Sequence, residues 1–411
     1  MDYESLLAKA EQECEPVFAR FARIERENFA RVLQAFTEEN VGTQHFAPTT
    51  GYGYDDVGRQ TLERVFARVF GCESALVRPH IVSGTHALAL GLFGLLRPGQ
   101  RLLAAAGRPY DTLEPVIGIE RKKDGSLADW GVGYDEAALL PNGEPDLAAI
   151  GEAVCKETGV VLVQRSRGYA WRPALSLEQI GAICETVHRK NPQALVMVDN
   201  CYGEFTCTQE PTAYGVDLMV GSLIKNPGGG LAPTGAYVAG RESCVARVAE
   251  RLTAPGIGGE EGSYAASYQP FFQGFYLAPH TVAQALRGAA LAACAFARAG
   301  YTTHPAFDGP RSDIIQAVRL ETPERLVAFC RAVQAASPVD SFALPEPSEM
   351  PGYQDQVIMA AGTFVSGASI ELSADAPMRE PYIAYWQGGL TYEHCRLTVK
   401  RILEEIGCRT A

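Results

Sequence analysis

The chain has 411 residues, of which 47% are hydrophobic and 20% are charged, and its formal net charge is −12. This length suits one large core with a smaller one beside it. The negative net charge gives no indication of a basic surface, which argues against a nucleic-acid partner. No apolar run reaches the length that spans a bilayer, so we expect no membrane segment.

The cysteines argue against two further classes of protein. There are 11 of them and no Cys-x-x-Cys pair, so the chain lacks both the spacing of a metal site and a disulfide framework. Free thiols in this number indicate a reducing compartment. Residues 1–16, MDYESLLAKAEQECEP, carry acidic side chains and no signal-peptide core. We therefore expect a cytoplasmic protein without a bound metal.

The N-terminal segment is predicted to be helical. Residues 4–40 place apolar side chains at roughly helical spacing among charges. A loop rich in glycine and tyrosine, TTGYGYDDVGRQ at 49–60, follows and predicts irregular structure. The next segment, 61–71, is predicted to be a helix that closes with Gly71.

From about 75 to 240 the pattern alternates between strands and helices. The short apolar runs are SALVRPHIV, RLLAAA, GVVLVQ, ALVMVDN, DLMVGS and GAYVAG, with helix-like stretches such as LSLEQIGAICETVHRK between them. This alternation favours an α/β fold with a mostly parallel sheet flanked by helices. Because such sheets bind ligands beyond the carboxyl ends of their strands, we expect the chemistry there.

The C-terminal part has a different pattern. A glycine-rich stretch at 254–263 precedes a predicted helix at 279–300, a helix at 322–336, strand-like segments near 355–373 and a closing helix at 391–407. We predict three parts: an N-terminal helical arm (1–48), a large domain (49–275) and a small α+β domain (276–411).

Two charged side chains follow neighbouring apolar runs. Asp199 ends ALVMVDN, and Lys225 lies just past DLMV in VGSLIKNPGGG. Taken singly, an Asp after a strand commonly caps a turn and a Lys in a loop is usually solvated. The separation, 225 − 199 = 26 residues, allows one crossover between neighbouring strands. Ser222 and the glycines at 228–230 flank the lysine, and glycine lets backbone approach a ligand closely.

Two further features follow strand-like runs. Ser83, Gly84 and Thr85 open a helical pattern. Such a start either binds a phosphate through its free backbone N–H groups or is simply capped by a side chain. Tyr110, in GRPYDT, follows RLLAAA and can stack on a flat ligand. A lysine, an acid, a phosphate cradle and an aromatic ring are what pyridoxal 5′-phosphate (PLP) requires of a protein. We therefore expect PLP as the cofactor.

These motifs resemble a known family. VDN at 198–200, SLIK at 222–225 and the glycine-rich tail resemble the cystathionine β/γ-lyase family of PLP enzymes. The motifs SGTHAL, GRPYDT, QRSRGYAWRP, VDNCYGEF, SLIKNPGGGLAPTGAY and QGGLTYEH look more closely like its methionine γ-lyase-like, or aluminium-resistance-protein, branch. The resemblance spans roughly residues 45 to 400 and implies the PLP-dependent transferase-like fold (aspartate aminotransferase, fold type I).

The resemblance also implies roles for individual residues. Lys225 is the Schiff-base and catalytic lysine, and Asp199 is the partner of the pyridine nitrogen. The residues that hold the phosphate are Ser83, Gly84, Thr85 and Ser222, and Tyr110 stacks on the cofactor and acts in catalysis. In the family, a Tyr and an Arg from the neighbouring subunit reach the phosphate, for which the candidates are Tyr52, Tyr54 and Arg59. The resemblance therefore implies a homo-oligomer, with a dimer of dimers expected.

One motif departs from the family. Its members read Arg-Leu-Ser near the C-terminus, and that arginine grips the substrate carboxylate as a bidentate fork. Here Glu371-Leu372-Ser373 aligns with that motif. The candidate replacements are Arg379 in APMREPY and Arg165 or Arg167 in QRSRGY. The departure bears on the substrate more than on the cofactor.

The resemblance implies a carbon–sulfur lyase that takes a sulfur amino acid to a keto acid, ammonia and a thiol by β- or γ-elimination. The fold also hosts transaminases, decarboxylases and eliminations on other amino acids, and a non-catalytic binding protein of this fold remains an alternative. A dinucleotide-binding oxidoreductase is disfavoured because Gly51-x-Gly53 is followed by a glycine only at 58. A P-loop nucleotidase is disfavoured because its motif does not occur.

Overall fold

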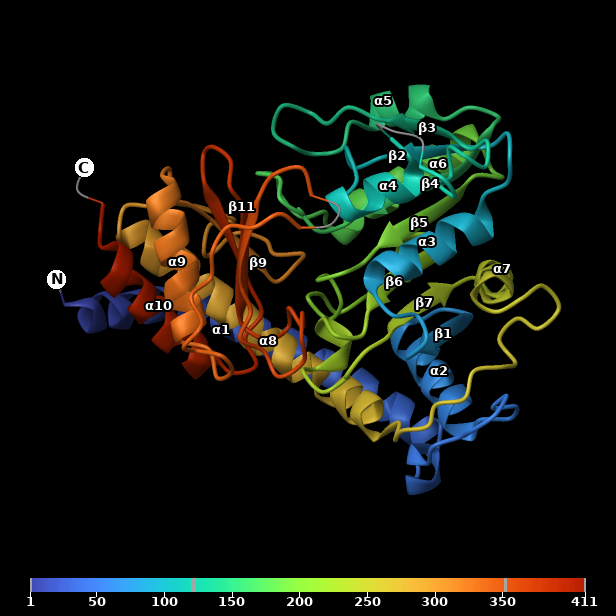
Figure 1. The fold of residues 1–411 in the computed structure, drawn as a ribbon, viewed down its shortest axis with the longest axis horizontal. Coiled ribbons are helices and arrows are strands. Elements are labelled where there is room, and N and C mark those ends of the chain that lie inside the picture. Colours follow the sequence, from blue (N-terminus) through green and yellow to red (C-terminus); the bar gives the residue numbers. More distant parts are fainter. Residues whose placement is uncertain (1, 120–122, 351–352, 410–411) are drawn as a thin grey trace.

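The computed structural model describes residues 2–119, 123–350 and 353–409 (Figure 1). Two long helices, α1 (Tyr3–Glu38) and α8 (Gln269–Arg298), pack along each other and run beneath both sheets. The predicted helix at 4–40 matches α1, which the Asp2 side chain caps by accepting from the backbone N–H of Glu4. The N-terminal helix also packs on the C-terminal one, α10 (Tyr392–Ile406), so both chain ends lie on the same side.

The helix α2 (Val57–Phe70) begins four residues before its predicted start at 61. Asp56 explains the difference, because its carboxylate accepts a 2.9 Å hydrogen bond from the backbone N–H of Arg59 and caps the helix there. The predicted end is confirmed by Gly71, whose φ of 62° suits glycine at a helix C-cap.

The large sheet has seven strands in the order β1-β7-β6-β5-β4-β2-β3. Strands β6, β5, β4, β2 and β3 are parallel, whereas β7 is antiparallel to both its neighbours. Their bounds are β1 (Ser74–Arg78), β2 (Arg101–Ala104), β3 (Gly133–Glu136), β4 (Thr158–Gln164), β5 (Leu195–Asp199), β6 (Leu218–Ser222) and β7 (Ala236–Gly240). The alternating apolar runs therefore did predict the sheet, except for the short β3.

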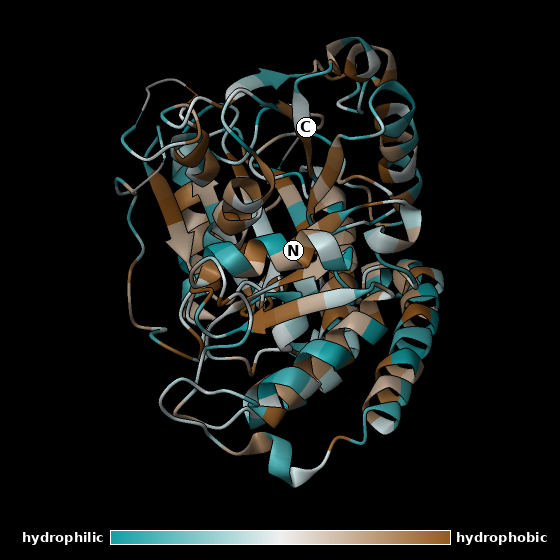
Figure 2. Ribbon diagram, turned by 90° about the vertical axis from the view of Figure 1, so that its right-hand side faces the viewer, coloured by the Kyte–Doolittle hydropathy of each residue, from teal (hydrophilic) through white to brown (hydrophobic). Residues whose placement is uncertain are grey.

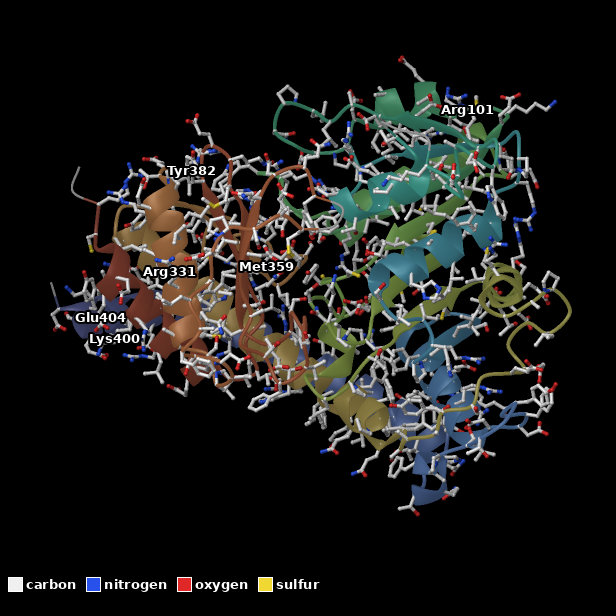
Figure 3. The ribbon with its side chains drawn as sticks, viewed as in Figure 1. Arg101, Arg331, Met359, Tyr382, Lys400 and Glu404 are labelled. Atoms are coloured by element: carbon white, nitrogen blue, oxygen red, sulfur yellow. The ribbon has the colours of Figure 1, made fainter. Side chains whose placement is uncertain are left out.

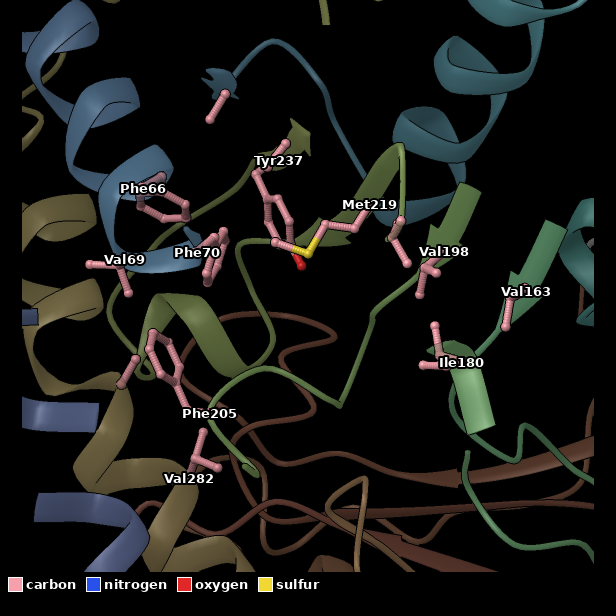
Figure 4. Close-up of a cluster of buried hydrophobic side chains, with 14 of the residues drawn as sticks. Phe66, Val69, Phe70, Val163, Ile180, Val198, Phe205, Met219, Tyr237 and Val282 are labelled. Carbon is pink, nitrogen blue, oxygen red and sulfur yellow. The ribbon is translucent and has the colours of Figure 1, made fainter. Parts of the chain in front are cut away.

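Helices cover both faces of this sheet. Strand β4 is apolar on both faces of the sheet, so both faces need a cover. Val161 and Val163 belong to a buried cluster on one face, and Val160 and Leu162 belong to a second cluster on the other. The first cluster joins the sheet to α1, α2, α8 and α6 (Leu177–Lys190), and Figure 4 shows part of it. The second joins it to α3 (Gly84–Leu95) and α7 (Glu242–Leu252). Two short helices, α4 (Glu114–Ile117) and α5 (Leu147–Ala153), complete this part. In Figure 2 the strands are largely brown, whereas the long helices carry both teal and brown residues.

The second sheet is antiparallel, in the order β10-β11-β12-β9-β8. Its strands are β8 (Thr302–His304), β9 (Ile315–Arg319), β10 (Val357–Ala360), β11 (Ser373–Pro377) and β12 (Ile383–Gln387). One face packs on α9 (Pro323–Ala335) and α10, which match the predicted helices at 322–336 and 391–407. On β11, Ala374 and Ala376 point to that face, so Ser373 and Asp375 point to the opposite one.

The helix α8 begins ten residues before its predicted start at 279, and Pro279 lies inside it. Its residues contribute to the apolar clusters of both sheets. The division that we predict at residue 275 falls within this helix and stays a proposal. Among the described residues, no helix has both the length and the apolar character to cross a bilayer.

Candidate active site

A cavity of about 320 Å³ lies where the carboxyl ends of β4, β5 and β6 face the second sheet. Both sheets line it; from the second, Met359 of β10 contributes, which is labelled in Figure 3. The cavity brings together seven predicted site residues, which are Ser83, Gly84, Thr85, Tyr110, Asp199, Ser222 and Lys225. The expectation that the chemistry lies beyond the strand ends thus fits this cavity.

Asp199 and Lys225 come from neighbouring strands. Asp199 is the last residue of β5, and it pairs with Val220 of β6, which ends at Ser222, three residues before the lysine. The backbone N–H of Cys201 donates a 3.1 Å hydrogen bond to Oδ1 of Asp199 and orients that carboxylate. The Lys225 ammonium lies 4.0 Å from the centroid of the Tyr202 ring.

The surroundings of Lys225 act on its pKa in opposite directions. Burial lowers the pKa, but the nearby Cys201, Tyr202 and Asp199 outweigh burial and hold it above its ordinary value. A cationic cofactor beside this amine would lower its pKa. The protein groups alone have the opposite effect, because they place the Asp199 carboxylate and the Tyr202 ring beside the ammonium.

The helix α3 points its N-terminus into the cavity. Ser83 caps it by accepting a 3.1 Å hydrogen bond from the backbone N–H of His86. A Cβ on Gly84 would lie 3.3 Å from Sγ of Cys201 and 3.5 Å from Cβ of Ser222, so the helix start packs closely on the ends of β5 and β6. Capping by Ser83 therefore leaves Gly84 and Thr85 beside the cavity, where a helix N-terminus is suited to an anion.

A group of four tyrosines forms the wall nearest the second sheet. The Tyr110 ring lies 5.6 Å from that of Tyr169 and 5.9 Å from that of Tyr353, and Tyr169 lies 5.3 Å from Tyr385. The hydroxyls of Tyr110 and Tyr353 are hydrogen bonded to each other. Burial, followed by the charge of Asp375, raises the pKa of Tyr110, so this phenol keeps its proton.

Asp375 is a cavity residue that the sequence analysis missed. It lies on β11 directly opposite Tyr385 of β12, and Ser373 lies opposite Gln387. All four residues line the cavity. The Gln387 side-chain amide donates a 3.0 Å hydrogen bond to Oδ2 of Asp375. Burial raises the pKa of Asp375 to about 6. The only signal available was an acidic residue within a short, mostly apolar strand, SADAP.

The predicted arginines do not line this cavity. Arg165 is fully buried, and its guanidinium donates to Oδ1 of Asn200 and to the carbonyl of Gly203. Arg379 borders an adjoining pocket that shares Tyr110 and Tyr169 with the cavity, and it forms a 3.1 Å ion pair with Asp355.

Two further residues from the quoted motifs, Arg167 and Glu371, have structural contacts outside the cavity. Arg167 also borders the adjoining pocket and donates to the carbonyl of His304. Glu371, where the family has its arginine, accepts 2.9 Å hydrogen bonds from the backbone N–H groups of Phe364 and Val365. That carboxylate therefore holds a loop in place and is not one of the cavity-lining residues.

The loop that we expect to reach a neighbouring subunit lies elsewhere on the chain. Arg59 is buried, and its guanidinium donates to the carbonyls of Gly53, Gly262 and Glu260. The Tyr54 hydroxyl donates to Glu261, and its ring is 58% exposed. Within one chain, Arg59 thus fastens two loops together and Tyr54 stays at the surface.

The cavity has the donor set that PLP requires. It combines a half-buried amine, a carboxylate held by a backbone N–H, and the N-terminus of a 12-residue helix flanked by the Ser222 hydroxyl. Lys225, Asp199 and Ser83 to Thr85 are the residues that would hold the aldehyde, the ring nitrogen and the phosphate. This combination on a mostly parallel sheet defines the class of fold-type-I PLP enzymes.

Comparisons with known proteins agree with this class. The sequence model described as methionine gamma-lyase matches residues 3–407, and the chain belongs to that family. A Listeria monocytogenes protein described as involved in aluminium resistance is 50% identical, with a TM-score of 0.96, covering 98% of this chain and 100% of that one. A carbon–sulfur lyase involved in aluminium resistance from Clostridium novyi is 47% identical, with a TM-score of 0.94 and coverage of 98% and 96%.

A more distant structure bears on the fold alone. YhfS of Escherichia coli, described as PLP-dependent, is 19% identical with a TM-score of 0.63, covering 94% of this chain and 96% of that one. The predicted family, the fold class and the enzyme class, a carbon–sulfur lyase, are therefore confirmed.

Proposed function

We propose that this protein is a PLP-dependent carbon–sulfur lyase that acts on a sulfur amino acid. The observation that carries the proposal is the meeting of Lys225, Asp199 and the N-terminus of α3 in one cavity. Bound PLP supplies an electron sink for the carbanion formed at the substrate's α-carbon. The overall reaction breaks a carbon–sulfur bond, consumes water and yields a thiol, ammonia and a keto acid.

The chain's own residues supply the proton transfers. The neutral Lys225 amine takes the proton from the α-carbon, and a cationic cofactor beside it would favour that neutral form by opposing the groups that raise its pKa. Tyr110 retains its phenolic proton because burial raises its pKa, and it donates that proton to the leaving sulfur. Asp199 keeps the ring nitrogen protonated through its charge. Arg379, at the adjoining pocket, is our candidate for the substrate carboxylate.

We also propose a homo-oligomer, a dimer of dimers, in the cytoplasm. The exposed Tyr54 supports the first part, since a ring at the surface is available to a neighbouring site. The cysteines support the cytoplasmic location, because none of those in the described part of the chain forms a disulfide. Mixed oligomers of Tyr54→Phe and Lys225→Ala subunits test the sharing of sites, because partial recovery of activity requires it. A fully active monomer by light scattering would contradict it.

A product assay tests the reaction itself. The purified holoenzyme is incubated with methionine, homocysteine, cystathionine and cysteine, and keto acid, ammonia and thiol are measured. The proposal predicts equal amounts of all three products from at least one substrate. Transamination or decarboxylation of another amine, with no thiol from any of the four, would overturn the lyase function and leave only the cofactor assignment.

A further inference from the structure

The cavity holds a carboxylate that the cofactor does not use. Its charged lining residues, within the described chain, are Asp199, Lys225 and Asp375. The first two serve PLP under the proposed function. Asp375 comes from the second sheet, and no Lys, Arg or His of the described residues lies within 4.0 Å of its carboxylate as an ion-pair partner. The Asp375 side chain is half-buried, and Lys225 acts on it only beyond ion-pair distance. A partly desolvated carboxylate gains from a directly paired cation, which a bound molecule can supply.

Three buried hydroxyls line the same cavity, those of Ser369, Ser373 and Tyr169. The Ser373 hydroxyl has no hydrogen-bond partner, whereas the Tyr169 hydroxyl interacts with Asp375 itself and the Ser369 hydroxyl interacts with Tyr202. Ser373 shares a face of β11 with Asp375, two residues away. Buried polar groups are normally hydrogen bonded. Together, one carboxylate and three hydroxyls provide the acceptors for a group that donates several hydrogen bonds.

The aromatic wall suits the same kind of group. Rings of Tyr169, Tyr353 and Tyr385 lie beside Asp375, with Tyr169 5.9 Å from Tyr353 and 5.3 Å from Tyr385. Aromatic faces attract cations, most strongly where water is excluded. An ammonium has three donors and no acceptor, so it matches both the acceptors and the rings, whereas a carboxylate would meet repulsion from Asp375.

We propose that Asp375 is a specificity-determining residue that selects substrates whose sulfur-linked leaving group ends in a protonated amine. This inference rests on the proposed lyase function and names its substrate class. If Tyr110 donates its proton to the leaving sulfur, the group beyond that sulfur extends towards Tyr169, Tyr353 and Asp375. In the reaction the Cβ–S bond breaks, the sulfur takes a proton, and water converts the remaining fragment to a keto acid and ammonium.

Two thioether substrates of matched size test whether the charge of the leaving group, rather than its shape, decides the rate. S-(2-aminoethyl)cysteine ends in an ammonium, whereas S-propylcysteine has a methyl group in its place. The wild-type holoenzyme should release thiol from the first with a kcat/KM about 10- to 100-fold higher, the range expected of a hydrogen bond to a buried charge. Asp375→Asn and Asp375→Ala should bring this ratio close to one.

The control is Asp340→Asn, which makes the same change at an exposed position of positive φ that asparagine tolerates. It should keep the wild-type ratio. Cleavage of both thioethers by the wild type with equal kcat/KM would overturn the inference and leave the lyase function standing. An equal loss on both substrates in Asp375→Asn would also overturn it, since Asp375 would then act in proton transfer.

A binding measurement keeps the inference separate from turnover. Calorimetry on PLP-loaded Lys225→Ala protein should show the aminoethyl compound binding about tenfold more tightly than the propyl compound, and Asp375→Asn should abolish the difference. This holds even if the wild type cleaves neither compound, in which case only the proposed reaction fails. Equal affinity of the Lys225→Ala protein for both compounds would contradict the inference.

Discussion

The ammonium nitrogen of Lys225 lies 4.0 Å from the centre of the Tyr202 ring. Tyr202 adopts a positive φ of 73°, a conformation uncommon for a tyrosine. The strained backbone presents the ring to the lysine at the end of β5, beside Asp199. An ammonium over an aromatic face in a buried site is stabilised by about 2 kcal/mol, so the ring favours the charged form of the lysine.

Removing that ring should lower the pKa of Lys225. We expect Tyr202→Leu to shift the pH midpoint for PLP incorporation into the apoprotein downward by about one unit, since one unit corresponds to about 1.4 kcal/mol. Tyr202→Phe keeps the ring and serves as the control, because both variants share the same backbone requirement. Incorporation followed by absorbance against pH checks this. Identical midpoints for the Leu and Phe variants would show that the ring does not act on the lysine.

The charge of Asp199 should matter more than its shape. In Asp199→Asn the side-chain oxygen can still accept from the backbone N–H of Cys201, so the local fold should persist. The link between Lys225 and PLP should form normally, whereas kcat/KM should fall by about 100-fold or more because the ring nitrogen loses its charged partner. Visible absorbance and steady-state kinetics measure the two effects. Activity within a few-fold of wild type argues against the assignment.

A buried carboxyl outside the cavity predicts a pH dependence of stability. Burial raises the pKa of Glu204 to about 8, although the Tyr237 hydroxyl donates a 2.7 Å hydrogen bond to it. The folded protein therefore holds a proton that the unfolded chain releases near pH 4.5. Its contribution to stability is complete below that pH and is lost as the pH rises to about 8.

Glu204→Gln removes this titration while keeping an oxygen for the Tyr237 hydroxyl. The variant should gain stability relative to wild type as the pH rises from 5 to 8, by an amount on the order of a few kcal/mol. Thermal unfolding of both apoproteins across this range measures the gain. A difference between them that stays constant with pH would mean that Glu204 does not titrate in this window.

The sequence predicted the half of the cavity that the parallel sheet builds. Asp199, Lys225 and the start of α3 each follow an apolar run, and parallel strands bring their carboxyl ends to one edge. Local pattern was therefore enough to place them together.

The other half depends on long-range contacts. Asp375, Tyr385 and Gln387 come from antiparallel strands whose register decides which side chains face the cavity. Neither β9 nor β12 was foreseen from the sequence. Tyr353 reaches the cavity from outside any strand, and no local pattern predicts such a placement.

Borohydride reduction of the holoenzyme, followed by peptide mass spectrometry, identifies the lysine that carries PLP. Reduction fixes PLP covalently to the lysine that binds it. The account predicts the added pyridoxyl mass on Lys225 in the wild type, and none on any peptide of Lys225→Ala treated in parallel. Modification of a different lysine, or a Lys225→Ala protein that keeps both the label and the lyase activity, would contradict it.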